Sequence, residues 1–282
     1  MRVDEQTITL GGSPVFYRAA APPDAGGTAA PHDRPLPLYL HGVPTSSDDW
    51  VPFLERSGGL APDLIGFGRT GKGGNLDYTL AGLTDFVQRL LGHLGFHDRP
   101  IQLIGHDWGG AVALALAQRH QHTVERIVLI NAVPLGPTGF RWHRNARLWR
   151  RPLLGELAMG ATTKWLLSRA LKSGTTTDAA WPQQRLDAIW RQFDQGTQRA
   201  ILRLYRASDE GSLARAGADL NTLTMPALVL WGTRDPWIPS TIADACHQAL
   251  QNSRLEPAPD AGHWPWLDHP AVIDRVAQFL RG

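Results

Sequence analysis

The pattern of apolar and polar positions alternates between two kinds of segment. Short apolar runs that end in turn residues occupy residues 36–42, 60–66, 101–107, 126–132 and 227–232. Most of these runs are continuous, which is typical of strands that are buried on both faces of a sheet. Residues 79–95 and 109–120 instead carry apolar positions at helical spacing. The alternation of strand and helix predicts an α/β domain with a mostly parallel sheet.

The two ends of the chain add smaller elements to this sheet. Near the start, the runs TITL and VFYR are separated by GGSP, which predicts a β-hairpin. Residues 22–35 are rich in Pro, Gly and Ala and predict a loop. Near the end, LEPAP at residues 255–259 is a short strand-like run.

The alternation stops between about residues 135 and 215, where no strand-like run occurs and where five of the eleven tryptophans lie. Helices are predicted there at residues 141–151, 153–171, 181–193 and 196–208. The apolar strand pattern resumes at residue 227. We therefore expect a core domain formed by residues 1–134 and 216–282, with a helical cap, or lid, formed by residues 135–215.

Composition and charge narrow the class of protein. The net charge of +2 gives little support for nucleic-acid binding, and we interpret the Arg-rich residues 140–151 as a solvated helix face with buried aromatic residues. Cys246 is the single cysteine, so no internal disulfide forms and a reducing compartment fits. No apolar run has the length of a signal core or a membrane span. We expect a cytoplasmic protein with no nucleic-acid or membrane partner.

One motif carries candidate chemistry. GHDWG at residues 105–109 places Asp107 between a predicted strand and a predicted helix, which is the context of a nucleophile held on a sharp turn. A plain helix N-cap is the alternative role for this aspartate. Asp235 follows a later strand and His263 lies in a late loop, which is the order nucleophile, acid, histidine. We predict that the three residues form a catalytic triad.

A second motif, HGVP at residues 41–44, follows an apolar strand directly. We expect the backbone N–H of Val43 to form an oxyanion hole with the backbone N–H of Trp108. A carboxylate such as that of Asp107 is already anionic at neutral pH and suits displacement at a saturated carbon, with an alkyl ester as the product. His263 would then activate water to hydrolyse that ester.

Several motifs together resemble one family. LHGVPTSS, LAPDLIGFGRT, GHDWGG, LVLWGTRDP and AGHWPWLDHP span nearly the whole chain and resemble the aspartate-nucleophile branch of the α/β-hydrolase superfamily. That branch contains epoxide hydrolases and haloalkane and haloacetate dehalogenases. The resemblance implies an α/β-hydrolase fold, with a mostly parallel sheet flanked by helices and an inserted helical lid. It implies no cofactor and no metal.

Within this branch, residues of the lid distinguish enzymes that open an epoxide from enzymes that release a halide. Epoxide hydrolases place a tyrosine acid on a late lid helix, typically followed by Arg, and this matches Tyr205. A second acid normally comes from the early lid, where this chain has no tyrosine and where His143 or Trp142 lies nearest. Trp108 fits both an epoxide hydrolase and a haloalkane dehalogenase, whose halide donors are indole N–H groups. Lid candidates for a second such donor are Trp142, Trp149 and Trp165. Haloacetate dehalogenases normally carry Arg where this chain has Trp108.

The resemblance therefore implies an epoxide hydrolase that forms a vicinal diol through a covalent ester of Asp107. Tyr205 and His143 would support the opening oxygen. Three further residues would contact the substrate: Val43, Trp108 and Trp142. The alternative is a haloalkane dehalogenase that releases halide and alcohol by the same ester route. A further alternative is a non-catalytic ligand-binding α/β-hydrolase. The expected partners are a small apolar epoxide or halogenated substrate and water, and the expected assembly is a monomer or homodimer.

Overall fold

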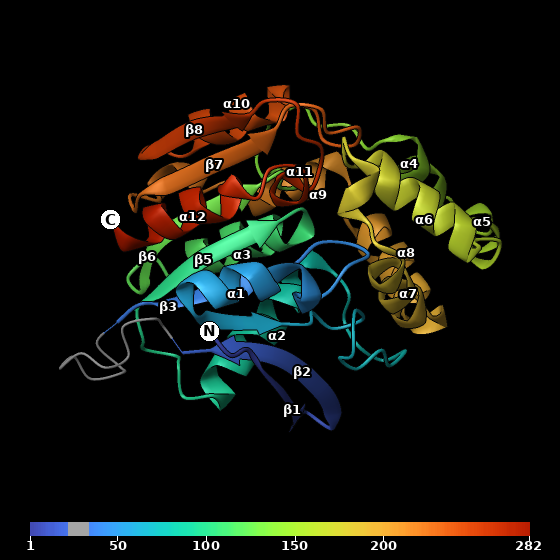
Figure 1. Cartoon of the computed structure of the whole chain (residues 1–282), viewed down its shortest axis with the longest axis horizontal. Coiled ribbons are helices and arrows are strands. Elements are labelled where there is room, and N and C mark those ends of the chain that lie inside the picture. Colours follow the sequence, from blue (N-terminus) through green and yellow to red (C-terminus); the bar gives the residue numbers. More distant parts are fainter. Residues whose placement is uncertain (22–33) are drawn as a thin grey trace.

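The computed structural model describes residues 1–21 and 34–282, and its centre is one eight-stranded sheet (Figure 1). The strand order is β1-β2-β4-β3-β5-β6-β7-β8. The pairs β1–β2 and β2–β4 are antiparallel, and all other neighbours are parallel. The strands are β1 (Asp4–Leu10), β2 (Ser13–Ala20), β3 (Leu36–Leu40), β4 (Gly59–Pro62), β5 (Ile101–His106), β6 (Val124–Ile130), β7 (Ala227–Gly232) and β8 (Ser253–Ala258).

Burial explains this order. All residues of β4, β5 and β7 are buried, as continuous apolar runs require, whereas β1 lies at the edge and is mostly exposed. The predicted hairpin, parallel strands and C-terminal strand are confirmed. The predicted strand 60–66 was too long. The chain leaves the sheet after Pro62, because Gly66 and Gly68 adopt left-handed backbone conformations. The loop predicted at 22–35 lies almost entirely outside the described residues.

Helices cover both faces of the sheet. On one face, α1 (Val51–Ser57) contacts α12 (Ala271–Arg281), and both lie in front of the strands in Figure 1. Elsewhere α2 (Leu80–His93) packs against α3 (Trp108–Arg119), and α10 (Thr241–Ala249) packs against β7 and β8. The core also contains the short α11 (Pro265–Asp268) and two 3-10 turns, η1 (Ser47–Trp50) and η3 (Leu220–Thr222), and a third 3-10 turn, η2 (Asp178–Ala180), lies between α6 and α7. The predicted helices at 79–95 and 109–120 are confirmed as α2 and α3.

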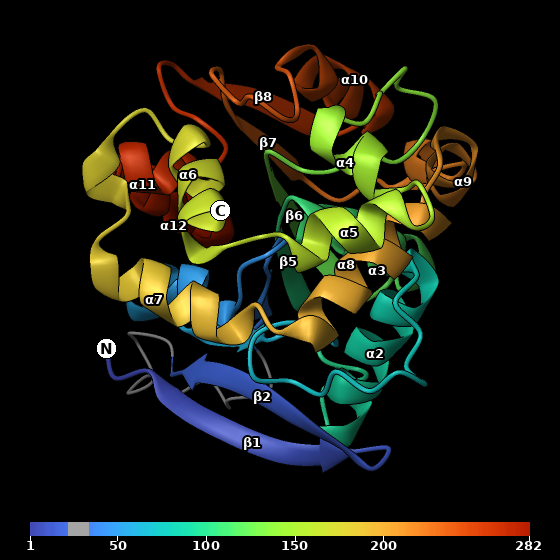
Figure 2. The same cartoon turned by 90° about the vertical axis from the view of Figure 1, so that its right-hand side faces the viewer.

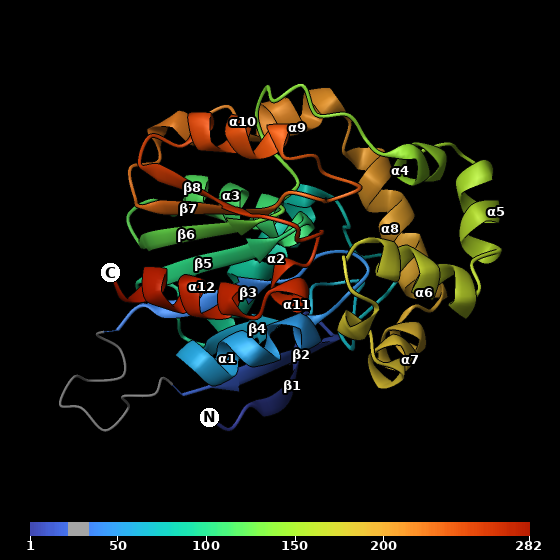
Figure 3. The same ribbon diagram turned by 45° about the horizontal axis from the view of Figure 1, so that its top comes forward.

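The segment between β6 and β7 contains no strand, and after a loop at residues 131–143 it is mainly helical. It holds α4 (Arg144–Trp149), α5 (Leu154–Gly160), α6 (Lys164–Ser173), α7 (Gln183–Gln192), α8 (Gln195–Ala207) and α9 (Glu210–Ala216). Figures 1 and 3 show α4 to α8 beyond the tips of the parallel strands, and Figure 2 looks onto them from outside. We call α4 to α8 the cap. The exact division of the chain at residues 134 and 216 stays a prediction.

One helix of the cap was predicted wrongly. Residues 153–171 form two helices, not one, because Thr163 starts a new helix by accepting the N–H of Leu166 with its side chain. The predicted helices 181–193 and 196–208 correspond to α7 and α8. Cap and core are joined by ion pairs, Arg185 with Asp49 at 2.7 Å and Lys72 with Asp194 at 2.9 Å.

The turn between β5 and α3 depends on glycine. A Cβ on Gly109 would lie 1.9 Å from the carbonyl oxygen of Leu40, so α3 can approach β3 only if this position has no side chain. We expect Gly109→Ala to lower the free energy of unfolding by about 3 kcal/mol or more, since the backbone of two elements must shift.

Gly92 in α2 is the matched control, because a Cβ there meets nothing within 4 Å. Gly92→Ala should leave stability unchanged or raise it by up to about 1 kcal/mol. Urea unfolding of both variants measures the difference, and equal stabilities would contradict this account of the turn.

Candidate active site

Asp107 occupies the strand–helix turn in a strained backbone conformation. Its φ is 50° and its ψ is −121°, a region that non-glycine residues seldom adopt. Its side chain makes no capping hydrogen bond to α3, so the helix-cap alternative does not describe it. Instead Oδ2 accepts the N–H of Val43 at 2.8 Å. A Cβ on Gly42 would lie 2.7 Å from the same oxygen, so this close approach requires glycine there.

The Asp107 carboxylate is buried, and its charge is balanced by opposing effects. Burial, the largest effect, raises the pKa of Asp107 from 3.8 to about 6, with a smaller upward contribution from Asp235. His263 and the backbone N–H groups of Val43 and Trp108 act in the opposite direction. The side chain is therefore mostly anionic at neutral pH, but it is far less strongly solvated than a surface aspartate.

The second carboxylate and the histidine form a direct pair. Asp235 follows β7, and its Oδ2 lies 2.6 Å from Nδ1 of His263. The other oxygen, Oδ1, accepts the backbone N–H groups of Trp237 and Ile238 at 2.8 and 3.1 Å. These donors fix the carboxylate, which in turn fixes the tautomer of His263 with its proton on Nδ1 and a free lone pair on Nε2.

The histidine ring is held among aromatic side chains. Ring centroids of Trp237, Trp264 and His106 lie 4.9, 4.8 and 4.5 Å from that of His263. Burial lowers the pKa of His263, but the carboxylates of Asp235 and Asp107 together raise it above its ordinary value. A base of this kind suits proton abstraction near neutral pH.

Two supporting residues were missed by the sequence reasoning. Asn131 directly follows β6, and its Nδ2 donates to Oδ2 of Asp235 at 2.8 Å. His106 precedes the candidate nucleophile, and its Nε2 donates to the carbonyl oxygen of His263 at 2.8 Å. A signal for Asn131 existed, because it is a polar residue at the carboxyl end of the strand that pairs with β7. The role of His106 depends on a loop far away in sequence and left no such signal.

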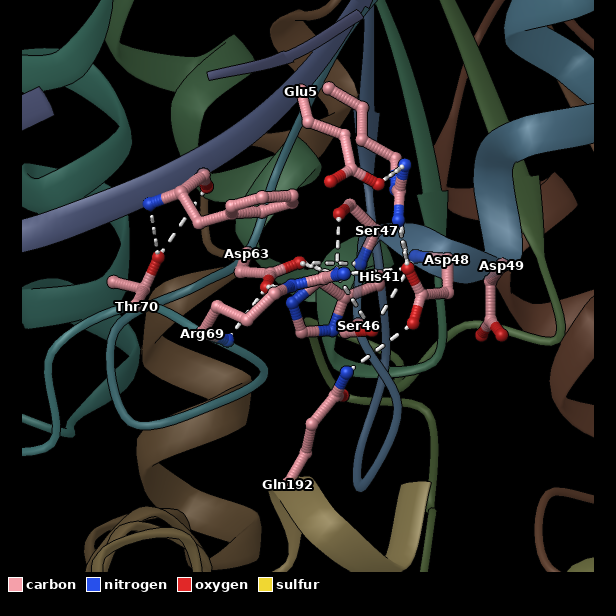
Figure 4. A network of polar contacts seen from close by, with 12 residues as sticks. Glu5, His41, Ser46, Ser47, Asp48, Asp49, Asp63, Arg69, Thr70 and Gln192 are labelled. Carbon is pink, nitrogen blue, oxygen red and sulfur yellow. Dashed lines mark hydrogen bonds and ion pairs between the residues drawn. The ribbon is translucent and has the colours of Figure 1, made fainter. Parts of the chain in front are cut away.

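The loop that carries Val43 is held by the polar network in Figure 4. Arg69 donates to Asp63 and Asp48, each at 2.9 Å, and Asp63 accepts the N–H of Ser47 at 2.8 Å. His41 accepts the N–H of Leu64 at 2.9 Å. The network fixes the loop from both sides, and it thereby fixes the N–H group aimed at the candidate nucleophile.

The side chains predicted from the lid gather around Tyr205. Its ring centroid lies 5.3 Å from Trp108, 4.8 Å from Trp142 and 5.2 Å from Trp149. Burial and the nearby Asp107 carboxylate raise the pKa of Tyr205 well above its ordinary value, and the neighbouring Trp108 side chain lowers it less. The phenol therefore keeps its proton at neutral pH and is a hydrogen-bond donor.

The indole groups in this cluster differ in what their N–H groups do. Trp142 stacks on Trp108, but its N–H donates to the carbonyl oxygen of Ser208 at 2.9 Å and is not available to a ligand. The N–H of Trp108 is buried and has no hydrogen-bond acceptor among the described residues. Trp165, the third lid candidate, is 65% exposed and lies outside the cavity.

His143 is placed at the start of α4, 6.5 Å from Tyr205 between ring centroids. Its Nδ1 accepts the N–H of Ala146 at 3.4 Å, which leaves the proton of the neutral ring on Nε2. Burial and the nearby His263 lower the pKa of His143 to about 4. At neutral pH His143 is therefore an uncharged donor.

These residues share one cavity of about 280 Å³ between core and cap. Asp107, His263, Tyr205 and His143 all line it, and the rest of its wall is mainly apolar. No Lys or Arg is among the residues that line it in the described part of the chain. The cavity wall also includes Trp142, Trp149, Trp237, Trp264, Leu148 and Leu166.

Two further findings concern what else the described residues hold. They contain no group of three or more His, Cys, Asp or Glu side chains placed to bind a metal ion. None of the helices in 1–21 and 34–282 combines the length and the apolar character of a membrane span.

The buried charge of Asp107 gives a test of the electrostatics. A pKa rise from 3.8 to about 6 corresponds to about 3 kcal/mol, by which the ionised carboxylate destabilises the folded protein above pH 6. At about pH 4 the carboxyl is neutral in the folded state and about half protonated in the unfolded state, so most of this penalty has disappeared. We expect Asp107→Asn to unfold with up to about 3 kcal/mol more free energy at about pH 8, and to lose most of this advantage at about pH 4. Urea unfolding at both pH values measures it, and a gain independent of pH would point to relief of backbone strain instead.

Comparison with known proteins agrees with this architecture. Over 269 residues the chain is 27% identical to epoxide hydrolase 3 of Xenopus tropicalis, covering 88% of this chain and 72% of the relative. It is 27% identical to an AB hydrolase superfamily protein of Bacillus subtilis, covering 90% and 92%. A haloalkane dehalogenase from Bradyrhizobium elkani superposes with a TM-score of 0.82 at 24% identity, covering 100% of this chain and 98% of the other.

The family assignment follows from sequence and topology together. The sequence model of the alpha/beta hydrolase fold matches residues 38–270, which include the turn with Asp107, both later members of the triad arrangement and the whole cap. The mostly parallel sheet flanked by helices is what the resemblance implied. The chain belongs to the α/β-hydrolase fold family.

Proposed function

We propose that the protein is an epoxide hydrolase that converts a small apolar epoxide into a vicinal diol. The observation that carries this proposal is the position of Tyr205, a buried phenol that lines the same cavity as Asp107 and keeps its proton. An epoxide oxygen leaves as an alkoxide and therefore needs a strong hydrogen-bond donor. An apolar wall without Lys or Arg suits a neutral substrate and not a carboxylate.

In the first step Asp107 attacks one epoxide carbon. Its Oδ2 accepts from Val43, so the other oxygen, Oδ1, is the attacking atom. A C–O ester bond forms, the C–O bond of the ring breaks, and the ring oxygen takes the proton of Tyr205. The uncharged His143 supports the same oxygen by donating from Nε2.

In the second step water hydrolyses the ester. His263 removes a proton from the water through Nε2, and the hydroxide adds to Cγ of Asp107. When this intermediate collapses, the bond between Cγ and Oδ1 breaks, and Oδ1 leaves as the second hydroxyl of the diol with the proton that His263 took from the water. The proton of the new carboxyl group returns to the Tyr205 phenolate, which restores the starting state of both side chains. The negative charge that develops on Oδ2 falls where the N–H groups of Val43 and Trp108 already point. Esterification also removes the charge of Asp107, one of the carboxylate charges that raise the pKa of His263, so the histidine stays neutral and basic at lower pH in the intermediate.

Haloalkane dehalogenation is the second candidate, and a specific observation favours it. The N–H of Trp108 is buried with no acceptor among the described residues, and a halide ion accepts from weak donors of this kind. Of the three lid candidates for a second indole donor, Trp142 is engaged by Ser208 and Trp165 faces solvent, which leaves Trp149 in the cavity wall. A non-catalytic ligand-binding role does not require the arrangement of Asp107, Asp235 and His263, so it does not account for these residues. The cytoplasmic location and a monomeric or dimeric state remain part of the proposal.

Substrate turnover separates these functions. The protein is incubated with styrene oxide and, separately, with 1-bromobutane. We expect diol formation without bromide release, no turnover by Asp107→Asn, and about a thousandfold slower turnover by His263→Gln with the alkyl ester of Asp107 visible by intact mass. Bromide release with inert epoxides would assign the protein to the dehalogenases, and inertness toward both would favour a binding role.

The role of Tyr205 has its own test. Tyr205→Phe should slow ring opening by about a hundredfold or more, because it removes the donor and preserves the ring packing. Any bromide release should be unaffected, since a halide needs no proton. Tyr17→Phe, a half-buried tyrosine of β2, is the matched control and should retain full activity. Full epoxide turnover by Tyr205→Phe in stopped-flow or product assays would remove Tyr205 from the mechanism.

A further inference from the structure

The outer surface of the cap is apolar to an unusual degree. Seven large apolar side chains are exposed in the described residues, and six of them lie between residues 148 and 166. They are Leu148, Leu153, Leu154, Leu157, Trp165 and Leu166. All six belong to α4, α5, α6 or the turns that join them, at the end of the molecule farthest from the chain termini (Figure 1). We call these six residues the cap patch.

Helical geometry shows that the exposure is systematic. In α6, Leu167 and Leu171 are buried, whereas Trp165 and Leu166 project from the other side of the helix. In α5, Met159 is buried and the exposed leucines point away from it. Each helix already buries one apolar stripe in the cap, so the cap patch is a second apolar surface that has no cover within the described residues.

Basic side chains surround the cap patch. Residues 141–172 contain eight Arg and Lys and a single acidic residue, although the whole chain carries a net charge of only +2. The acidic residue, Glu156, is paired with Arg206. Five of the basic side chains are exposed and form no ion pair with any described residue: Arg141, Arg144, Arg147, Arg151 and Arg169.

The cap patch is continuous with the active-site cavity. Leu148 and Leu166 are 38% and 45% exposed, and both also line the cavity. The cap patch is therefore joined through these two leucines to the mainly apolar wall of the cavity that Asp107 and Tyr205 also line. Figure 2 shows the helices concerned, α4, α5 and α6, facing outward over the strand tips.

We propose that the cap patch docks on the surface of an anionic lipid bilayer, with its leucines and Trp165 in the headgroup region and the arginines on the lipid phosphates. Exposed Leu and Trp beside unpaired Arg is the composition of interfacial membrane segments. Such docking needs no spanning helix, so the expectation of no membrane partner, which rested on the lack of a spanning or signal segment, does not bear on it. An apolar substrate dissolved in the bilayer would then enter the cavity without crossing water.

A second copy of this chain fits the cap patch less well. A two-fold interface places the same surface of both copies face to face. It would bring the unpaired arginines of one copy against those of the other, with Glu156 already engaged by Arg206. Anionic headgroups instead supply the charge that the surface lacks. The proposal is independent of whether the leaving group is an epoxide oxygen or a halide.

Vesicle co-sedimentation of the full chain tests the proposal. The vesicles contain either phosphatidylcholine alone or phosphatidylcholine with about one third phosphatidylglycerol. We expect binding to the anionic vesicles that weakens as salt is raised, and much weaker binding to the neutral ones. The variant Leu153→Ser/Leu157→Ser/Trp165→Ser, which spares the residues lining the cavity, should lose binding while keeping the thermal midpoint and turnover in solution.

Two double variants test whether the arginines beside the cap patch contact the lipid headgroups or whether the vesicles attract any positive charge on the protein. Arg144→Gln/Arg147→Gln should weaken binding to anionic vesicles by about thirtyfold, at roughly fivefold for each charge. The matched control Arg89→Gln/Arg275→Gln removes two exposed charges from α2 and α12 and should bind like the parent.

Four results would overturn the proposal. The first is no binding to anionic vesicles at low salt. The second is equal binding by the triple variant, and the third is an equal loss of binding in both arginine pairs. The fourth is a dimer, measured by light scattering, that the triple variant converts to a monomer, which would assign the cap patch to contact between copies of this chain.

Discussion

The hydrogen bond from the N–H of Val43 to the carboxylate of Asp107 is the contact on which the site depends. It joins the loop after β3 to the turn after β5, two neighbouring strands of the sheet. The turn forces Asp107 into a strained backbone conformation, and only the glycines at positions 42 and 109 allow the approach of loop, helix and strand. The strained turn thus lowers the stability of the fold, and in return it holds the side chain of Asp107 in one direction.

The same contact sets the electrostatic character of the site. The Asp107 carboxylate loses most of its hydration on burial, and two backbone N–H groups and the neighbouring histidine replace part of what is lost. The proposed nucleophilic role fits this setting, because an anion with little bound water has little water to lose before it reacts. The pKa of His263 in turn depends on the carboxylates of Asp235, Asp107 and Asp49, so a change of charge on Asp107 alters the basicity of the histidine.

Much of this could be predicted from the sequence, and the exceptions have physical reasons. Continuous apolar runs specify buried strands, and residues directly after such strands must meet at one sheet edge, which is how Asp107 and Asp235 were found together. The contact of His106 with the His263 carbonyl and the engagement of the Trp142 indole by Ser208 join residues far apart in the chain. Periodicity carries no information about such pairs. The break between α5 and α6 was not predicted, because it depends on a single side chain, Thr163, which caps the start of α6, while the apolar spacing on both sides of it is helical.

The cap faces two environments, and this explains its composition. Its inner side places Tyr205, Trp149 and His143 over Asp107, where aromatic rings exclude water and leave a few donors. Its outer side exposes leucines and Trp165 among arginines, at a cost in solubility that a protein with an entirely aqueous partner has no reason to bear. The proposed ring opening and the proposed bilayer contact both depend on the cap, the first through Tyr205 and His143 on its inner side and the second through the cap patch on its outer side. On these two proposals the specificity of this protein lies in the cap, while the sheet supplies the arrangement of Asp107, Asp235 and His263.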